Sequence, residues 1–285
     1  MKKCIIFGAG SAIAQNFIKE YQNDFSIHAF ARHQLKENFK INFYQTDYTD
    51  LSKYQSIFDE VDNIIYCIGV TNASDQEIKK INSELFVKIF KYFNNKKNVI
   101  FISSAAILFN KGAYVNSKLS CENYLRQSIH NFISLRPSVM HGEFDENNLI
   151  KMQDFIKKMP FIPVIAPKHV IQPVYMRDIT KVFARAIEEN KFTNKLYTVS
   201  GPKQIQLIYV FKLLKKKLNS KKLLVPIPLR PVQLMVKFLA FFLPKDLIMA
   251  HQILNMKIHE PFNSGELEKD YHYQPRSFEE TIFKY

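Results

Sequence analysis

The first half of the chain alternates short apolar runs with stretches of helical periodicity, and this alternation constrains the fold most strongly. Runs such as CIIF, NIIYCI and VIFI are apolar throughout, as expected for strands that are covered on both faces. Six strands are expected, at residues 3–7, 26–31, 41–45, 63–68, 98–103 and 131–135. Strands that alternate with helices at this spacing predict an α/β domain with a doubly wound parallel sheet.

The pattern changes after about residue 143. Prolines at positions 160, 163, 167 and 173 interrupt it, and helices are expected to dominate from residue 178 onward. The chain has 285 residues, enough for one large domain with a smaller lobe. We therefore expect a first domain over residues 1–142 and a smaller, mainly helical substrate lobe over residues 143–285.

The loop after the first strand is rich in small residues. In FGAGSAIAQNF it leads directly from the strand into a helix expected at residues 12–21. Backbone N–H groups at such a helix N-terminus approach a pyrophosphate only if the side chains are small. The loop therefore predicts a Rossmann-like dinucleotide site, with a plain tight turn as the alternative. Its expected cofactor-binding residues are Gly8, Gly10, Ser11, Ala12 and Ile13.

The end of the second strand indicates which dinucleotide is preferred. Sites that select NAD usually place a carboxylate there to bind the ribose 2′-hydroxyl, whereas this strand leads into Arg32. An arginine can neutralise a 2′-phosphate, so NADP(H) is expected, with NAD(H) as the alternative. Arg32 could equally extend into solvent. Asp47, after the third strand, would lie near the adenine or serve only as a turn residue.

The stretch GAYVNSK places Tyr114 and Lys118 four residues apart, on one face of an expected helix. Cys121 and Leu125 continue that face, so it is expected to point inward and to be apolar. A lysine in line with such a stripe is poorly placed for solvation. An acid–base pair is therefore expected, and an ordinary tyrosine beside a solvated lysine is the alternative.

Charge and cysteine content narrow the range of partners. The formal net charge of +14 favours anionic partners such as nucleotides, phosphates, nucleic acid or an acidic membrane. The lysine cluster at 215–222 lacks interleaved aromatic residues, so nucleic acid is not expected. The three cysteines are scattered and the eight histidines show no ligand spacing, so no disulfide or metal site is expected. A reducing, cytoplasmic setting fits best.

No apolar run approaches the roughly 20 residues of a membrane-spanning helix. The nearest is VQLMVKFLAFFLP, residues 232–244, which contains Lys237 and ends at a proline. A packed helix is expected there, and weak association with a membrane surface is the alternative.

Several segments resemble, in the same order, those of a known family. They are GAGSAIA, QTDYTD, VDNIIYCIG, VIFISSAA, YVNSK, ISLRPSVMHG and QPVYMRDIT, and YHYQPRSFEETI resembles the family's closing segment. The chain is thereby similar to the extended short-chain dehydrogenase/reductases, also called NAD-dependent epimerase/dehydratases. The resemblance covers nearly the whole chain and is loose over residues 200–260.

The resemblance implies a role for each catalytic candidate. Tyr114 would be the general acid/base; a free tyrosine, with a pKa of about 10, is protonated near neutral pH. Lys118 beside it favours the phenolate and would also hold the nicotinamide ribose. Ser104 would hydrogen-bond the substrate oxygen, and it is preferred to Ser103 because it directly precedes Ala-Ala-Ile. The resemblance also implies that the cofactor contacts Ile68, Gly69, Pro137 and Val139.

The second half of the chain fits a nucleotide-diphosphate sugar by the same resemblance. Asn148 stands where relatives contact the nucleotide diphosphate, and Arg177 could meet a phosphate or simply begin a helix beside Asp178. The segment 172–178 would return the chain to the core, so that residues from about 170 to 200 join the first domain.

Two departures from the family pattern limit the chemistry. The interval from Ser104 to Tyr114 is shorter than is common in the family. Sugar dehydratases of the family carry an Asp-Glu pair after the serine or threonine, where this chain has Ala105-Ala106. A methyl group cannot move a proton, so dehydratase activity is not expected.

The leading hypothesis is an NADP(H)-dependent oxidoreductase that reduces a keto group of a nucleotide-diphosphate sugar, because Arg32 favours use of NADPH. An NAD-dependent nucleotide-sugar 4-epimerase is the runner-up, since the same Tyr–Lys–Ser set serves both reactions. Two further hypotheses are a non-catalytic dinucleotide-binding assembly protein and a membrane-associated reductase of a lipid-linked or small carbonyl substrate. A homodimer is compatible with each of them.

Overall fold

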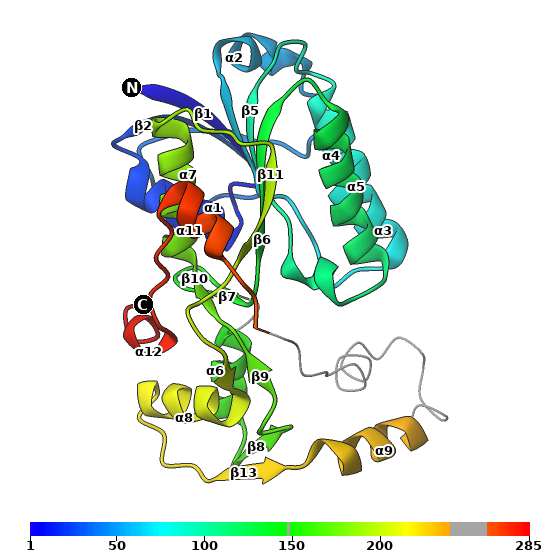
Figure 1. The fold of residues 1–285 in the computed structure, drawn as a ribbon, viewed down its shortest axis with the longest axis vertical. Coiled ribbons are helices and arrows are strands. Elements are labelled where there is room, and N and C mark those ends of the chain that lie inside the picture. Colours follow the sequence, from blue (N-terminus) through cyan, green and yellow to red (C-terminus); the bar gives the residue numbers. More distant parts are fainter. Residues whose placement is uncertain (147–148, 240–260) are drawn as a thin grey trace.

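The computed structural model describes residues 1–146, 149–239 and 261–285. At its centre lies a seven-stranded sheet, parallel throughout, with the order β11-β6-β5-β4-β1-β2-β3 (Figure 1). The strands are β1 (Lys2–Phe7), β2 (Phe25–Ala31), β3 (Asn42–Gln45), β4 (Asn63–Tyr66), β5 (Asn98–Ile102), β6 (Asn131–Pro137) and β11 (Lys195–Val199). The expected doubly wound parallel sheet is confirmed.

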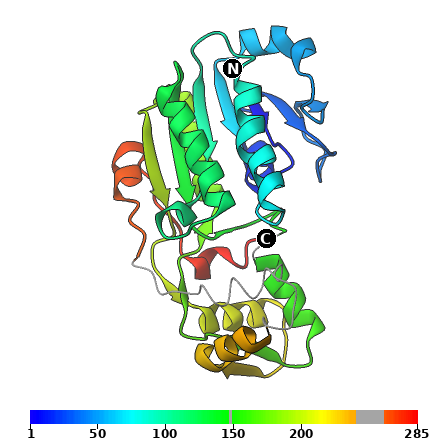
Figure 2. The ribbon, with the colours of Figure 1, turned by 90° about the vertical axis from the view of Figure 1, so that its right-hand side faces the viewer.

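Helices cover both faces of this sheet, which is why its central strands are apolar throughout. One face carries α1 (Ala12–Tyr21), α7 (Met176–Glu188) and α11 (Gly265–Tyr271). The other carries α2 (Gln55–Glu60), α3 (Asp75–Lys79), a π-helical turn (Lys80–Glu84), α4 (Leu85–Phe90) and α5 (Ala113–Gln127). Figure 2 shows α5 beside the α3–α4 pair in front of the sheet. Two 3-10 turns, Ser52–Tyr54 and Ala105–Leu108, precede α2 and follow β5.

The six expected strands are all present, with small shifts at their ends. β4 ends at Tyr66 and not at Ile68, although the Cys67 N–H still bonds the Phe7 carbonyl of β1 at 2.8 Å. β6 continues to Pro137, two residues further than expected. The helical segment between β4 and β5 is divided into α3 and α4 by the π-helical turn. β11 adds a seventh strand beyond β6.

The smaller lobe lies below the C-terminal edge of the sheet in the view of Figure 1. Among the described residues its helices are α6 (Leu149–Lys158), α8 (Leu207–Lys217), α9 (Leu229–Leu239) and α12 (Phe278–Thr281). Its short strands pair as β7 (Met140–His141) with β10 (Val174–Tyr175), β8 (Ile162–Ile165) with β13 (Leu224–Ile227), and β9 (Val170–Ile171) with β12 (Ile205–Gln206). Its core gathers apolar residues of α6, β8, α8 and α12.

The apolar segment 232–244 begins inside α9, and its last five residues lie outside the described part of the chain. Val232 is buried, whereas Leu234 on the same helix is 70% exposed. Among the described residues, we find no helix with the length and apolar character needed to cross a bilayer.

Candidate active site

The phosphate loop lies where β1 turns into α1. Gly8 has a φ of +79°, and a Cβ there would lie 2.7 Å from the backbone nitrogen of Ile68, so only glycine fits. Ser11 caps α1, its Oγ accepting the N–H of Ala14 at 3.4 Å. The backbone of the loop therefore lies close to that of Ile68 and leads directly into the N-terminus of α1. This arrangement fits a dinucleotide pyrophosphate.

Two adjoining cavities follow the C-terminal edge of the sheet. The first has a volume of about 490 Å³ and the second about 380 Å³. Both are lined by Gly10, Ser11, Cys67, Gly69 and Glu146, so they form one elongated cleft. Ten of the predicted residues line the first cavity: Gly10, Ser11, Ala12, Ile13, Gly69, Ser104, Tyr114, Lys118, Pro137 and Val139. Gly8, Arg32 and Ile68 line the second.

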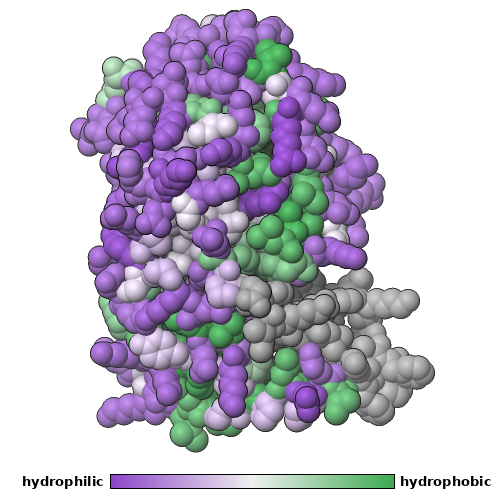
Figure 3. Space-filling view, in the orientation of Figure 1, coloured by the Kyte–Doolittle hydropathy of each residue, from purple (hydrophilic) through white to green (hydrophobic). Residues whose placement is uncertain are grey.

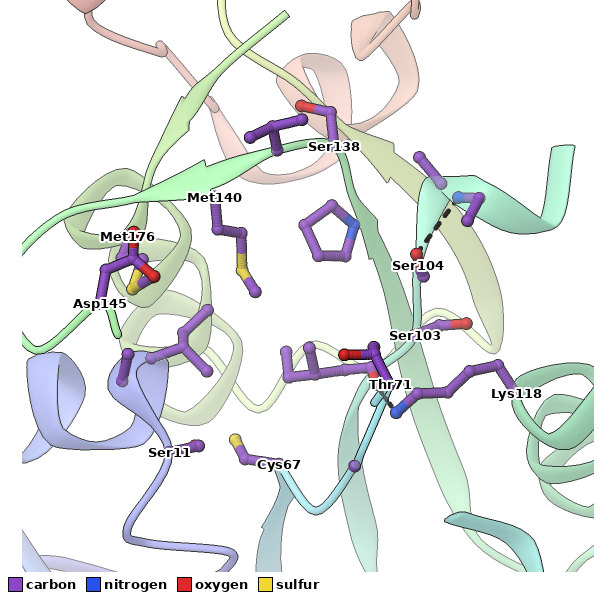
Figure 4. A pocket seen from close by; sticks show the side chains of 18 of the residues that line it. Ser11, Cys67, Thr71, Ser103, Ser104, Lys118, Ser138, Met140, Asp145 and Met176 are labelled. Carbon is purple, nitrogen blue, oxygen red and sulfur yellow. Dashed lines mark hydrogen bonds between the residues drawn. The ribbon is translucent and has the colours of Figure 1, made fainter. Parts of the chain in front are cut away.

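Lys118 is held inside the protein. Its side chain is buried, and Nζ donates to the Ile102 carbonyl at 2.8 Å and to the Ile68 carbonyl at 3.4 Å. Nζ also stands 5.0 Å from the centre of the Phe101 ring. Figure 4 shows the lysine extending from α5 toward the loop after β4. Lys118 is thus not a solvated surface lysine, and its charge is directed into the cavity that Tyr114 also lines.

The rest of α5 explains this placement. Cys121 and Leu125 are each 1% exposed, so the face that begins at Tyr114 and Lys118 is buried as expected. One turn beyond Lys118, Glu122 receives two hydrogen bonds from Arg136, at 2.9 and 2.6 Å. Arg136 directly precedes Pro137 in the cavity wall, so this ion pair fixes α5 against the wall.

The two serines after β5 differ in their surroundings. Ser104 is half-buried and its Oγ accepts the N–H of Ala106 at 3.2 Å, which leaves the hydroxyl proton free to donate. Ser103 is buried, and its Oγ has no partner within the described residues. Both line the first cavity, and Figure 4 places them on the side opposite Met140 and Met176.

Asn82 joins the loop after β4 to α5, although the sequence pattern did not single it out. It lies in the π-helical turn, where Oδ1 accepts the Val70 N–H at 2.8 Å. Its Nδ2 donates to the Val70 carbonyl at 2.9 Å and to the Ser117 Oγ at 3.2 Å. Asn82 thereby fixes the loop after β4 against the turn of α5 that precedes Lys118. A polar residue in an otherwise apolar helical pattern was the available signal.

Tyr48 is a second residue that the sequence pattern did not indicate. Its hydroxyl donates to the Phe30 carbonyl at 2.8 Å and accepts the Gly8 N–H at 3.2 Å, which secures the phosphate loop. Burial raises the pKa of Tyr48 to about 12, so it stays a donor. Its neighbour Asp47, expected near the adenine, lines neither cavity. The Asp47 carboxylate accepts the Thr49 N–H and hydroxyl, which lower its pKa and close a local turn.

The end of the cleft formed by the second cavity is basic. Arg32, His33 and Lys36 line the second cavity. The Arg32 side chain is exposed, and its guanidinium forms no ion pair within the described residues. Lys36 pairs with Glu146 at 2.7 Å. The end of β2 therefore offers a cation, and no carboxylate, to whatever occupies this end.

Residues 143–146 form a strap that links the lobe to the nucleotide-binding domain. Glu143 accepts hydrogen bonds from Lys19 at 2.6 Å and from Arg177 at 2.9 Å. Burial raises the pKa of Glu143, but the hydrogen bonds and charges of these two cations outweigh it and lower the pKa overall. Glu146 lines both cavities and pairs with Lys36, which lines the second. The strap thus borders the cleft where its two cavities adjoin.

Asn148 and Arg177 are the two residues that the sequence suggested as diphosphate contacts. Asn148 lies outside the described residues. Arg177 lines neither cavity, because its guanidinium is bound by two carboxylates, Glu143 and Glu20, the latter at 3.1 Å. The structure therefore assigns the charge of Arg177 to holding the strap and not to the cleft.

Comparison with family models identifies the chain. Residues 4–200 match the model of the NAD dependent epimerase/dehydratase family. The chain belongs to this family. It is therefore an enzyme of the NAD-dependent epimerase/dehydratase type, as the resemblance in the sequence indicated. Comparison with curated proteins gave no significant match.

Solved structures with the same fold match this chain over nearly its whole length. The UDP-N-acetylglucosamine 4-epimerase of Methanobrevibacter ruminantium, in complex with UDP-N-acetylmuramic acid, is 17% identical, with a TM-score of 0.77 over 99% of this chain and 96% of that one. The UDP-glucose 4-epimerase of Thermotoga maritima, with UDP-glucose, is 15% identical, with the same TM-score and coverage. The Bordetella bronchiseptica enzyme WbmF, in complex with NAD+, is 12% identical, with a TM-score of 0.77 over 99% and 91%. At these identities the likeness shows the fold alone.

Proposed function

We propose that the protein is an NADP(H)-dependent oxidoreductase that reduces a keto group of a nucleotide-diphosphate sugar to an alcohol. The observation that carries this proposal is a single cleft with two different ends. Tyr114, Lys118 and Ser104 line one end, and Arg32 lines the other without a neighbouring carboxylate at the end of β2.

A nicotinamide dinucleotide, when bound, supplies the hydride. Gly8, Gly10 and Ser11 would hold its pyrophosphate, because the loop leaves room there for backbone approach. Arg32 would neutralise the 2′-phosphate that distinguishes NADP(H) from NAD(H). Lys118 would hold the nicotinamide ribose.

The chain's own residues supply the proton chemistry. Tyr114 donates a proton to the carbonyl oxygen of the substrate as that oxygen becomes a hydroxyl. Lys118, a buried cation fixed by two carbonyls, favours the phenolate that remains. Ser104 donates to the same substrate oxygen, because its Oγ already accepts a backbone N–H and keeps its proton available.

A nucleotide-diphosphate sugar is the substrate class that best fits the cleft. Two structures of the same fold hold UDP-linked sugars. Met140, Phe144 and Phe262 of the lobe line the first cavity, together with residues at the edge of the sheet. The cavity therefore lies between the lobe and the sheet, where a sugar would bind. Ala105 and Ala106 line the same cavity and carry no proton donor, which argues against dehydration.

An NAD-dependent 4-epimerase is the second candidate. The strap at residues 143–146 favours it, because the Lys36–Glu146 pair at the border of the cleft would slow the release of a bound cofactor. Several structures of the same fold are also epimerases.

Two measurements separate the candidates. Mass spectrometry of the purified protein identifies any nucleotide that it retains, and a panel of keto-sugar nucleotides with added NADPH reports net reduction. We expect consumption of NADPH with at least one member of the panel. Tightly held NAD with interconversion of sugar epimers and no consumption of NADPH would replace the reductase by the epimerase.

A further inference from the structure

The tip of the small lobe carries two exposed apolar side chains, Phe161 and Leu223. Phe161 and Leu223 directly precede the paired strands β8 and β13, whose register joins Ile162 to Leu224. The Ile162 N–H also donates to the Leu223 carbonyl at 2.8 Å, so the two exposed residues stand at the same end of this sheet. Phe161 is 45% exposed and Leu223 is 70% exposed.

Strand β8 of this sheet has one buried side and one apolar, partly exposed side. Ile162 and Val164 point inward and are completely buried. Side chains alternate along a strand, so the residues next to Ile162 and Val164 point outward. The register places these outward residues of β8 opposite Val225 and Ile227 of β13. The outward residues are apolar and at least partly exposed: Phe161, Pro163, Ile165, Leu223, Val225 and Ile227.

Four lysines adjoin this tip along the chain, Lys157 and Lys158 shortly before Phe161 and Lys221 and Lys222 directly before Leu223. Residues 201–239 contain nine lysine and arginine residues and no aspartate or glutamate. Lys157, Lys221 and Lys222 line one shallow hollow of about 590 Å³. Lys222 donates to the last carbonyls of α6, and Lys157 lies 3.8 Å from Asp154, whereas Lys158 and Lys221 are exposed and form no ion pair within the described residues.

We propose that this apolar and basic tip, formed by Phe161, Leu223 and the lysines around them, docks on a bilayer surface that contains anionic lipids. Apolar side chains enter the acyl boundary while lysines meet the headgroups, which is the composition of interfacial membrane contacts. Lysine is depleted in interfaces between proteins, so a protein partner fits less well. Figure 3 shows hydrophobic side chains at this lower end of the molecule with hydrophilic ones beside them.

The docking would leave the cleft free. None of the tip residues lines either cavity of the cleft. The proposal is therefore independent of the reaction assigned to the site, and its variants are expected to keep the basal activity unchanged.

Co-sedimentation of the full chain with vesicles tests the proposal. We expect binding to phosphatidylcholine vesicles that contain phosphatidylglycerol, little binding to phosphatidylcholine alone, and weakening by salt because surface charges are screened. The variant Lys158→Gln/Lys221→Gln should reduce partitioning by about tenfold or more. Phe161→Ser/Leu223→Ser should reduce it comparably, since it removes the inserted groups.

Matched variants on the nucleotide-binding domain serve as controls. Lys91→Gln/Lys96→Gln removes the same charge from exposed positions, and Ile129→Ser removes an apolar side chain that is 60% exposed. Both should bind vesicles as the unaltered protein does. Failure of the unaltered protein to bind anionic vesicles at low salt would overturn the proposal. So would full binding by the Phe161→Ser/Leu223→Ser variant, which would indicate non-specific attraction to any polyanion, including RNA.

Discussion

The two ends of the cleft hold their cations in opposite ways. Lys118 is 4% exposed and is fixed by the Ile102 and Ile68 carbonyls, so the protein defines its position before any ligand arrives. Arg32 is exposed and has no acidic partner within the described residues. We therefore propose that the Lys118 end, which carries the catalytic candidates, is preorganised, whereas the Arg32 end, proposed to receive the adenosine, acquires its geometry from the nucleotide that binds there.

The largest expected effect lies at the preorganised end. Tyr114→Phe removes the proton donor and should lower turnover about a thousandfold, close to 4 kcal/mol, while cofactor binding stays intact. Steady-state kinetics and a fluorescence titration of NADPH measure the two quantities. Tyr124→Phe, on the same helix, is the matched control and should keep full activity. Undiminished turnover in Tyr114→Phe would remove the acid–base role.

The next effect tests what holds the catalytic helix in place. Glu122→Gln leaves Arg136 without its carboxylate partner in a mostly buried site and should reduce the free energy of unfolding by about 3 kcal/mol. Ser134→Ala removes one hydrogen bond from a neutral hydroxyl to the same carboxylate, 3.0 Å long, and should cost about 1.5 kcal/mol. Urea denaturation measures both. Equal losses would show that the ion pair does not anchor α5.

At the adenosine end the effect should depend on the ligand. Arg32→Ala should weaken NADPH binding by about thirtyfold, near 2 kcal/mol, because a charge-assisted hydrogen bond to the 2′-phosphate is lost. NADH binding should change less than about twofold, since NADH has no phosphate there. Arg126→Ala removes an exposed arginine of α5 and should leave both affinities unchanged. If Arg32→Ala weakened both nucleotides alike, the preference for NADP(H) would lose its basis.

The smallest effect concerns the strap between the two ends. Lys19 and Arg177 hold the pKa of Glu143 below its usual range, so the carboxylate stabilises the fold above the pKa of an unfolded glutamate, about 4.3. That stabilisation is lost as the pH falls through the lower, folded pKa. Glu143→Gln should therefore lower stability at neutral pH by about 1 kcal/mol or less, and the difference should shrink in acid.

Melting temperatures of the two proteins over a series of pH values provide this comparison. Glu60→Gln, which removes the exposed partner of Lys3, is the control and should have little effect at neutral pH. A Glu143→Gln difference that grew as the pH fell would contradict the proposed role of the strap.

Features set by local pattern could be predicted from the sequence. Apolar runs placed the six strands, because central strands of a covered parallel sheet must be apolar on both faces. The burial of Lys118 followed from the stripe that Cys121 and Leu125 continue, since helical spacing determines which side chains share a face.

Features set by distant contacts could not be predicted. The sequence left open whether Arg177 meets a phosphate or simply begins a helix; it lies in the first turn of α7 and pairs with Glu20, which is distant in the sequence and is placed by the packing of α1 on α7. Tyr48 has a left-handed φ of 66°, and its hydroxyl meets the N–H of Gly8, which lies 40 residues earlier in the chain. Neither arrangement has a periodic signature.

The central claim is that the Tyr114–Lys118–Ser104 end performs net reduction with hydride drawn from NADPH. Its most direct test follows NADPH oxidation and product formation together, with a keto-sugar nucleotide and the purified protein. The account predicts one alcohol formed for each NADPH consumed, and neither process in Tyr114→Phe. Sugar interconversion without consumption of NADPH would contradict it.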